Sequence, residues 1–255
     1  MATYKKRGYK PKTKKEKEEV VEENSTTAEV FNTLDESASK TEEWVVKNQN
    51  YIVGVIGLIA AVVLGYMAYG KYIAEPKAQD AMNDMYPAQK YYKDAQINTV
   101  SSDSLYTLAI NGGDGKYGFK DIINTYGGTP AANLANYYAG IASLNLKDYK
   151  SAIEYLGNFS SDDKVLSAVA FGAIGDAFAQ LDQKEEALPY YEKAANANKN
   201  DFNTPYFLMK AALISISLND NGKALEFLTT IKEDYPDSDE GKKVDPFIGR
   251  VEAAL

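Results

Sequence analysis

Few side chains in this sequence are of types that carry out chemistry. The chain contains no Cys and no His, which removes the thiolate nucleophile, the disulfide, the zinc knuckle and the usual general base. The acidic pairs Asp162-Asp163 and Glu185-Glu186 are adjacent in sequence, so on helices their carboxylates point in different directions and form no paired acid–base site. We therefore expect a protein that is not an enzyme and that uses no metal or cofactor.

A glycine-rich segment, Gly112 to Gly118 (GGDGKYG), superficially suggests a phosphate loop. It lacks the G-x-x-x-x-G-K-[ST] spacing and no strand precedes it. The ligand pattern of a calcium loop is also missing. We interpret this segment as a turn.

The longest uncharged run, 23 residues from Asn48 to Gly70, determines how the rest of the chain is organised. As a helix it is about 34 Å long, enough to cross a hydrocarbon core of about 30 Å. A buried core helix is the alternative, although such helices seldom stay free of charge for so long. We expect a transmembrane helix over residues 48–73, preceded by a cytosolic amphipathic helix over residues 25–47.

Small residues recur at spacings of three and four within this run. On a helix they form one stripe, where a second membrane helix could approach closely. The alternative is that Gly and Ala are simply common in membrane helices. The candidate docking residues are Gly54, Gly57, Ala61, Gly65 and Ala68.

The first 24 residues form a basic arm that we expect to be disordered. No apolar run follows early enough for a signal peptide. The arm could be a topology determinant that stays in the cytosol, or it could contact anionic lipid headgroups or ribosomal RNA. Its basic residues include Lys5, Lys6, Arg7, Lys10, Lys12, Lys14 and Lys15.

Net charge separates the arm from the rest of the chain. The first 50 residues hold ten basic and ten acidic side chains, so the whole net charge of −8 lies after them. An acidic body is unsuited to neutralising the phosphates of a nucleic acid. Because the short basic arm is hard to translocate, we expect the N-terminus in the cytosol and the acidic C-terminal domain on the exported side.

The segment 74–130 is expected to hold a connecting helix followed by a degenerate helical repeat. Its helix covers Glu75 to Asn98, Val100 to Gly118 reads as loop, and Phe119 to Thr129 reads as the second helix of the degenerate unit.

Three segments of residues 131–255 superpose, which predicts helical hairpins. Gly140, Gly175 and Ala212 are each followed twelve residues later by Ala, at offsets of 35 and 37 residues between units. Small residues at these positions permit close helix crossing, and the offsets are near the 34-residue tetratricopeptide period. The predicted fold is therefore all-α, with one N-terminal transmembrane helix and a tetratricopeptide-repeat solenoid of three clear hairpins plus the degenerate unit.

Such a solenoid presents a concave surface built by its first helices, suited to extended or partly folded peptide. The alternative is that its apolar members are core residues and the groove is filled by the chain itself. The candidate groove residues are Tyr137, Ile141, Asp176, Gln180, Met209 and Leu213.

The order of cytosolic tail, membrane helix and acidic repeat domain resembles the YfgM-like ancillary subunits of the bacterial SecYEG translocon. The segments FKDIINTYGGTPAANLANYYAG and IGDAFAQLDQKEEALPYYEKA are similar to repeats of that architecture. The resemblance covers residues 25 to 255 and leaves the basic arm outside. It implies a single-pass protein of the bacterial inner membrane, with its C-terminal domain in the periplasm.

The resemblance implies an accessory subunit of the Sec translocon that holds exported unfolded chains. The implied partners are SecYEG, a membrane-anchored prolyl isomerase or another periplasmic chaperone, and membrane lipid, with the ribosome as a further partner of the arm. A structural scaffold of another cell-envelope complex, such as secretion or division machinery, is the alternative function.

Overall fold

The computed structural model describes the backbone of residues 26–255 and the side chains from residue 41 onward. The described chain is helical, without a β-strand, and its contacts divide it into two units, residues 1–69 and 70–255. The candidate residues of the basic arm lie outside the described residues.

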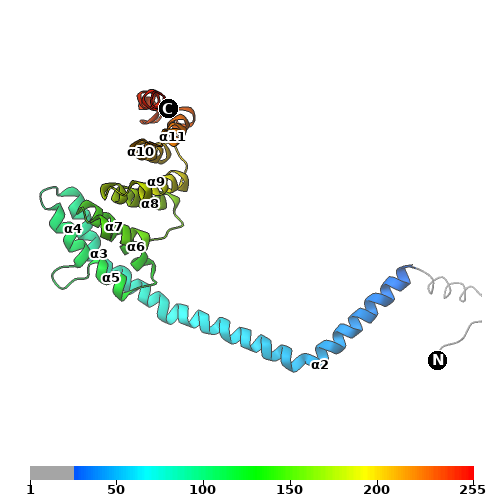
Figure 1. Cartoon of the computed structure of the whole chain (residues 1–255). Coiled ribbons are helices and arrows are strands. Elements are labelled where there is room, and N and C mark those ends of the chain that lie inside the picture. The colour runs from blue at the N-terminus through cyan, green and yellow to red at the C-terminus, as the bar shows by residue number, and fades with distance from the viewer. Residues whose placement is uncertain (1–25) are drawn as a thin grey trace, which may run out of the picture. The chain divides into compact units, whose positions relative to one another are not determined.

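The first unit contains one 44-residue helix, α2 (Thr26–Tyr69), drawn from blue to cyan in Figure 1. Two successive helices were expected over residues 25–47 and 48–73, and α2 covers residues 26–69 of this range as one helix. Within the described residues, one continuous helical stretch, Thr41–Ile97, is long and apolar enough to cross a membrane, and its most apolar part is not buried. This stretch contains the apolar half of α2. The all-helical fold with one long apolar helix is therefore confirmed, and that helix is consistent with single-pass membrane anchoring.

The second unit consists of short helices that pair with their neighbours in sequence (Figure 1). A five-residue π-helical segment, Gly70–Ala74, precedes its first α-helix. The α-helices are α3 (Glu75–Ile97), α4 (Ser102–Asn111), α5 (Phe119–Thr125), α6 (Pro130–Asn145), α7 (Tyr149–Gly157), α8 (Lys164–Gln180), α9 (Lys184–Ala197), α10 (Asn203–Ser217), α11 (Asn221–Asp234) and α12 (Asp245–Glu252), with a short 3₁₀ turn at Gly241–Lys243.

Loop was expected over Val100 to Gly118, and this is wrong for its first half, which forms α4. Tyr106, Ala109 and Ile110 lie on one face of α4 and are buried. Burial of this face outweighs the Ser- and Asp-rich composition that suggested a loop. The glycine-rich second half is a turn, as expected, closed by a bridge between Gly113 and Lys116.

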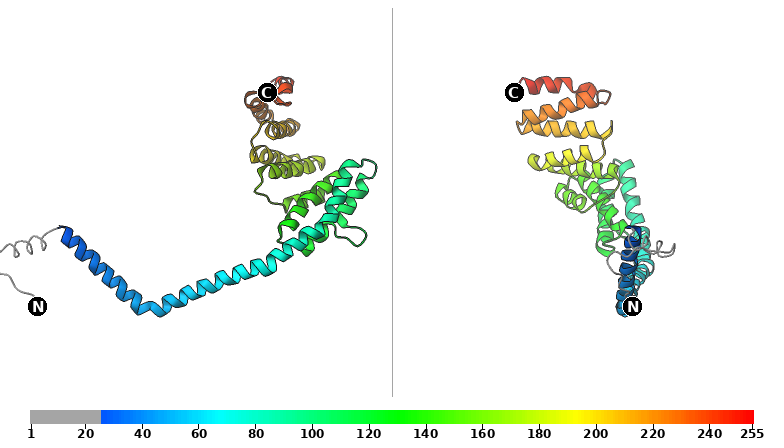
Figure 2. Two further views of the ribbon diagram at one scale, coloured as in Figure 1. Left: turned by 180° about the vertical axis from the view of Figure 1, so that it is seen from behind. Right: turned by 90° about the vertical axis from the view of Figure 1, so that its right-hand side faces the viewer.

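Three hairpins follow, α6–α7, α8–α9 and α10–α11, and α12 packs on the last of them. In the right-hand view of Figure 2, the helices from yellow to red lie one above the next. Their apolar residues form successive clusters, with α6 to α8 sharing one and α8 to α12 sharing another. Each hairpin is therefore held by its neighbours rather than by one central core.

The three hairpin turns have the same backbone geometry. Lys147, Asp182 and Asn219 have positive φ angles of 61°, 57° and 58°, and they are separated by 35 and 37 residues. In each turn the next N–H donates to the carbonyl five residues earlier, at 2.9 Å, as in a Schellman motif. These bonds are Asp148 to Ser143, Gln183 to Phe178 and Asp220 to Ser215. The repeat seen in the sequence is thus a structural repeat as well.

Small residues permit close contact inside the hairpins, as their spacing predicted. A Cβ atom added to Gly140 would lie 2.9 Å from Leu156 Cδ2, and one added to Gly175 would lie 2.8 Å from Tyr191 Cε1. Both distances are well below ordinary carbon contact. Leu156 also shares a cluster with Ala170, Ala173 and Ile174 of the following helix, so the same side chain joins two hairpins.

Candidate functional site

A cavity of about 580 Å³ lies between the hairpins, within the usual size range of ligand pockets. Helices α6, α8 and α10 supply most of its lining, and the turns before α10 and before α12 supply the rest. The lining comprises Ile141, Leu144, Val169, Gly172, Ala173, Asp176, Asp201, Phe202, Asn203, Tyr206, Phe207, Ser238, Asp239 and Glu240.

Local sequence places these helices. The Asp163 carboxylate caps α8 by accepting from the N–H groups of Val165 and Leu166, at 2.8 and 3.2 Å. Gly172 then allows α8 to approach α10, because an added Cβ would lie 2.6 Å from Phe207 Cζ. The wall of the cavity therefore depends on one residue without a side chain.

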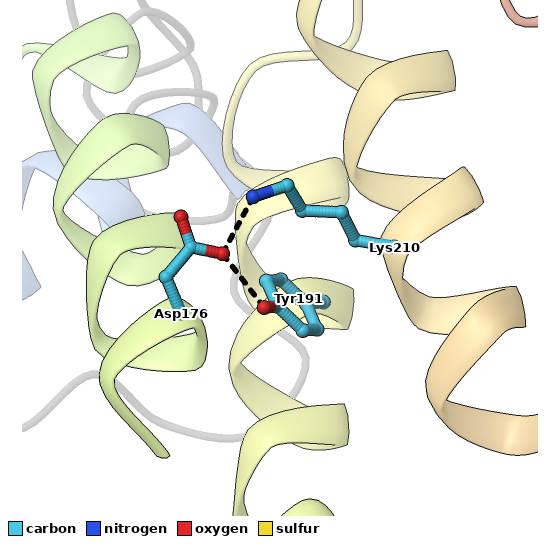
Figure 3. Close-up of polar contacts among 3 residues, drawn as sticks. All are labelled: Asp176, Tyr191 and Lys210. Atoms are coloured by element: carbon cyan, nitrogen blue, oxygen red, sulfur yellow. Dashed lines mark hydrogen bonds and ion pairs between the residues drawn. The ribbon is translucent and has the colours of Figure 1, made fainter. Parts of the chain in front are cut away.

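Asp176 is the centre of a polar cluster that joins three helices (Figure 3). Its Oδ1 accepts a hydrogen bond from the Tyr191 hydroxyl of α9 at 2.7 Å and from the Lys210 ammonium of α10 at 2.5 Å. Lys210 Nζ also lies 4.9 Å from the centre of the Tyr206 ring, which is a cation–π distance. The cluster connects the second hairpin to the third.

The electrostatics of this cluster favour its present protonation state. Burial, followed by the hydrogen bond to Asp176 and its charge, raises the pKa of Tyr191 far above its ordinary value. Burial by itself lowers the pKa of Lys210, but the hydrogen bond and charge of Asp176 outweigh it, and the net shift is upward. Tyr191 thus stays neutral and Lys210 stays charged, so neither is prepared to act as a base or nucleophile at neutral pH.

Two of the six candidate groove residues, Ile141 and Asp176, line the cavity. The structure does not gather the other four there. Tyr137 packs against Phe159 with ring centres 5.2 Å apart, and Met209 packs on the core of the last hairpins. Gln180 accepts a 3.4 Å hydrogen bond from Tyr149, and Leu213 is exposed.

The sequence did not single out the other cavity residues. Asp201, Phe202, Asp239 and Glu240 lie in turns, where no helical period marks them. Lys210 does not line the cavity, but its contact with Asp176 could have been predicted from the repeat. Leu213 is the position in the third unit that corresponds to Asp176 in the second, and Lys210 lies one helical turn before it. An acid and a base in adjacent first helices at nearly the same height predict an ion pair.

The candidate docking residues of α2 are all exposed. Nothing lies within 4 Å of a Cβ atom added to Gly54, Gly57 or Gly65. Within the first unit, the stripe is therefore open to contact with a helix of another protein.

In the described part of the chain, no group of three or more His, Cys, Asp or Glu side chains is arranged to hold a metal ion. Comparison with models of known protein families finds no match, and no curated protein matches the chain.

Proposed function

We propose that this chain is a non-enzymatic accessory subunit of the Sec protein translocon, anchored in the bacterial inner membrane by α2. Its exported domain is a tetratricopeptide-repeat solenoid that holds newly exported chains or chaperones. The observation that carries the proposal is the combination of one long apolar helix with a stack of three hairpins that enclose a cavity. A stack of this kind serves as a binding surface rather than as a reaction centre.

The cavity supports binding of polypeptide over catalysis. It combines an apolar floor with exposed aromatic side chains, Phe202 at 84% and Tyr206 at 44% exposure. Exposed aromatic residues beside a hollow are typical of protein interaction sites. An unfolded exported chain would present the apolar residues that such a surface binds.

The stripe of small residues supports docking of α2 beside another membrane helix.

Sulfhydryl-specific labelling can test the topology without background, because the chain has no Cys. A Val100→Cys variant is suitable, since Val100 is 96% exposed. A membrane-impermeant maleimide added to intact spheroplasts should label it, and a Cys placed in the basic arm should stay unlabelled until the membrane is opened.

The function is tested by recovering the tagged full-length chain from membranes in mild detergent and identifying its companions. We expect SecY, together with a periplasmic chaperone or a membrane-anchored prolyl isomerase; ribosomal proteins would indicate that the basic arm contacts the ribosome. Recovery of one envelope complex at fixed stoichiometry, without SecY, would instead establish the structural scaffold.

A matched pair of variants sharpens this test. Replacing Gly57, Ala61 and Gly65 by Leu fills the stripe, and all three positions are exposed. Replacing Ile56, Ile59 and Val63 by Leu changes three side chains on the opposite face of the helix and keeps that face apolar and of nearly the same volume. Loss of SecY in the first variant alone is expected; equal recovery with both would exclude the stripe as the docking face.

A further inference from the structure

The cavity is acidic as well as apolar. Its lining includes Asp176, Asp201, Asp239 and Glu240 but no Lys or Arg. Lys210 neutralises Asp176. The other three carboxylates make no hydrogen bond or ion pair within residues 41–255, so the lining contributes three unpaired negative charges.

These charges surround an apolar interior. Phe202 follows Asp201 directly and projects into solvent, while Ala173 and Ile141 form part of the lining. Because an apolar surface lowers the local dielectric constant, the carboxylates act more strongly on a bound charge than they would on an open surface. A ligand that fits the site therefore needs an apolar group for its interior and a positive charge for its rim, which is formed by Asp201, Asp239 and Glu240.

We propose that the cavity binds a segment of another polypeptide in which an aromatic or large aliphatic side chain lies between Lys or Arg residues. The apolar side chain occupies the interior, and the basic side chains pair with Asp201, Asp239 and Glu240. This inference rests on the proposed function and names the class of chain that the domain holds.

Charge complementarity favours this occupant over two others. A second copy of the domain is disfavoured because the chain carries its whole net charge of −8 after residue 50, so the two domains repel each other. The basic arm of the same chain has suitable chemistry, but α2 separates it from the cavity in the proposed topology.

The test uses the full-length chain in detergent micelles and fluorescence anisotropy of labelled nonapeptides. The first peptide has a central Phe-Leu pair between Arg residues, the second has Glu in place of Arg, and the third has Ser in place of Phe and Leu. We expect the first peptide to bind at least roughly tenfold more tightly than either control, and its binding to weaken as salt rises.

Variants locate the binding site. The rim variant Asp201→Asn/Asp239→Asn/Glu240→Gln should bind the first peptide roughly tenfold more weakly at low salt, because each exposed ion pair contributes a few-fold at most. The control Glu185→Gln/Glu186→Gln/Glu226→Gln removes the same charge from exposed positions outside the cavity and should bind as the wild type does.

Three results would overturn the inference. The first is equal affinity for the Arg and Glu peptides. The second is an equal loss of peptide affinity in the rim and control variants. The third is a rise in peptide affinity when residues 2–17 are deleted, which would show that the basic arm occupies the cavity. If SecY is recovered normally while the peptides fail to discriminate, the inference fails and the proposed function stands. If SecY is never recovered, the proposed function fails, whatever the peptides do.

Discussion

Replacing Gly172 by Ala should destabilise the exported domain, although Ala is the better helix former. The added Cβ would lie 2.6 Å from Phe207 Cζ and closer still to Cε1, whereas carbon atoms in contact are about 3.5–4.0 Å apart. The Phe207 ring, only 6% exposed, must then move by about 1.5 Å within a packed interface.

Overpacking of this kind lowers the free energy of unfolding by about 1–3 kcal/mol, and the higher helix propensity of Ala offsets about 1 kcal/mol of that loss. Because the clash is with a buried ring rather than a flexible side chain, we expect a net loss of about 1–2 kcal/mol. For a domain of this size that lowers the melting temperature by about 2–8 °C.

Thermal unfolding of the full-length chain in detergent, followed by circular dichroism at 222 nm, measures the shift. Gly249→Ala is the matched control, since Gly249 lies inside α12 with nothing within 4 Å of an added Cβ. Its melting temperature should not fall. Phe207→Leu removes the ring atoms that clash, so the double variant Gly172→Ala/Phe207→Leu should be more stable than the two single changes predict, by about 1 kcal/mol.

A Gly172→Ala variant as stable as Gly249→Ala would refute this reasoning. Strict additivity with Phe207→Leu would also refute it, because it would show that Cβ and the ring do not meet.

Three further changes test other contacts. Asp163→Ala removes the cap of α8 and should cost about 1 kcal/mol by the same thermal assay; a Ser replacement should restore most of it, and no loss would contradict the cap. Asp176→Asn leaves Lys210 without its anionic partner in a half-buried site and should cost about 2 kcal/mol by the same thermal assay; unchanged stability would contradict the ion pair. The hydrogen bond to Asp84 raises the pKa of Tyr126 from 10.0 to about 12, so its stabilisation is complete below pH 10 and disappears between pH 10 and 12. Tyr126→Phe should flatten stability over that interval, and an unchanged alkaline slope would contradict the bond.

The sequence predicted the hairpins well because their signals are local. Small residues such as Gly140 and Gly175, repeated at a fixed interval, specify where helices must approach, and the structure shows those approaches. The short helix α4 escaped prediction because burial of the face with Tyr106, Ala109 and Ile110 outweighs its Ser- and Asp-rich composition, and composition alone does not reveal that burial.

The cavity could be predicted only in part. Asp176 and Ile141 followed from the register of the first helices. Asp239 and Glu240 reach the same cavity from a turn that follows the last hairpin, and only the path of the chain through space brings them there. Sequence periodicity carries no information about such turns.

The turn that contributes Ser238, Asp239 and Glu240 also has a consequence for assembly during synthesis. Contacts in this domain are mainly between neighbours, so the hairpins can fold in the order in which they are translated. The cavity, however, draws on residues as far apart as Ile141 and Glu240. The nascent domain should therefore acquire its hairpins progressively but its binding site in a single late step, after α11 has been translated, and so remain unable to hold another chain while it is itself being made.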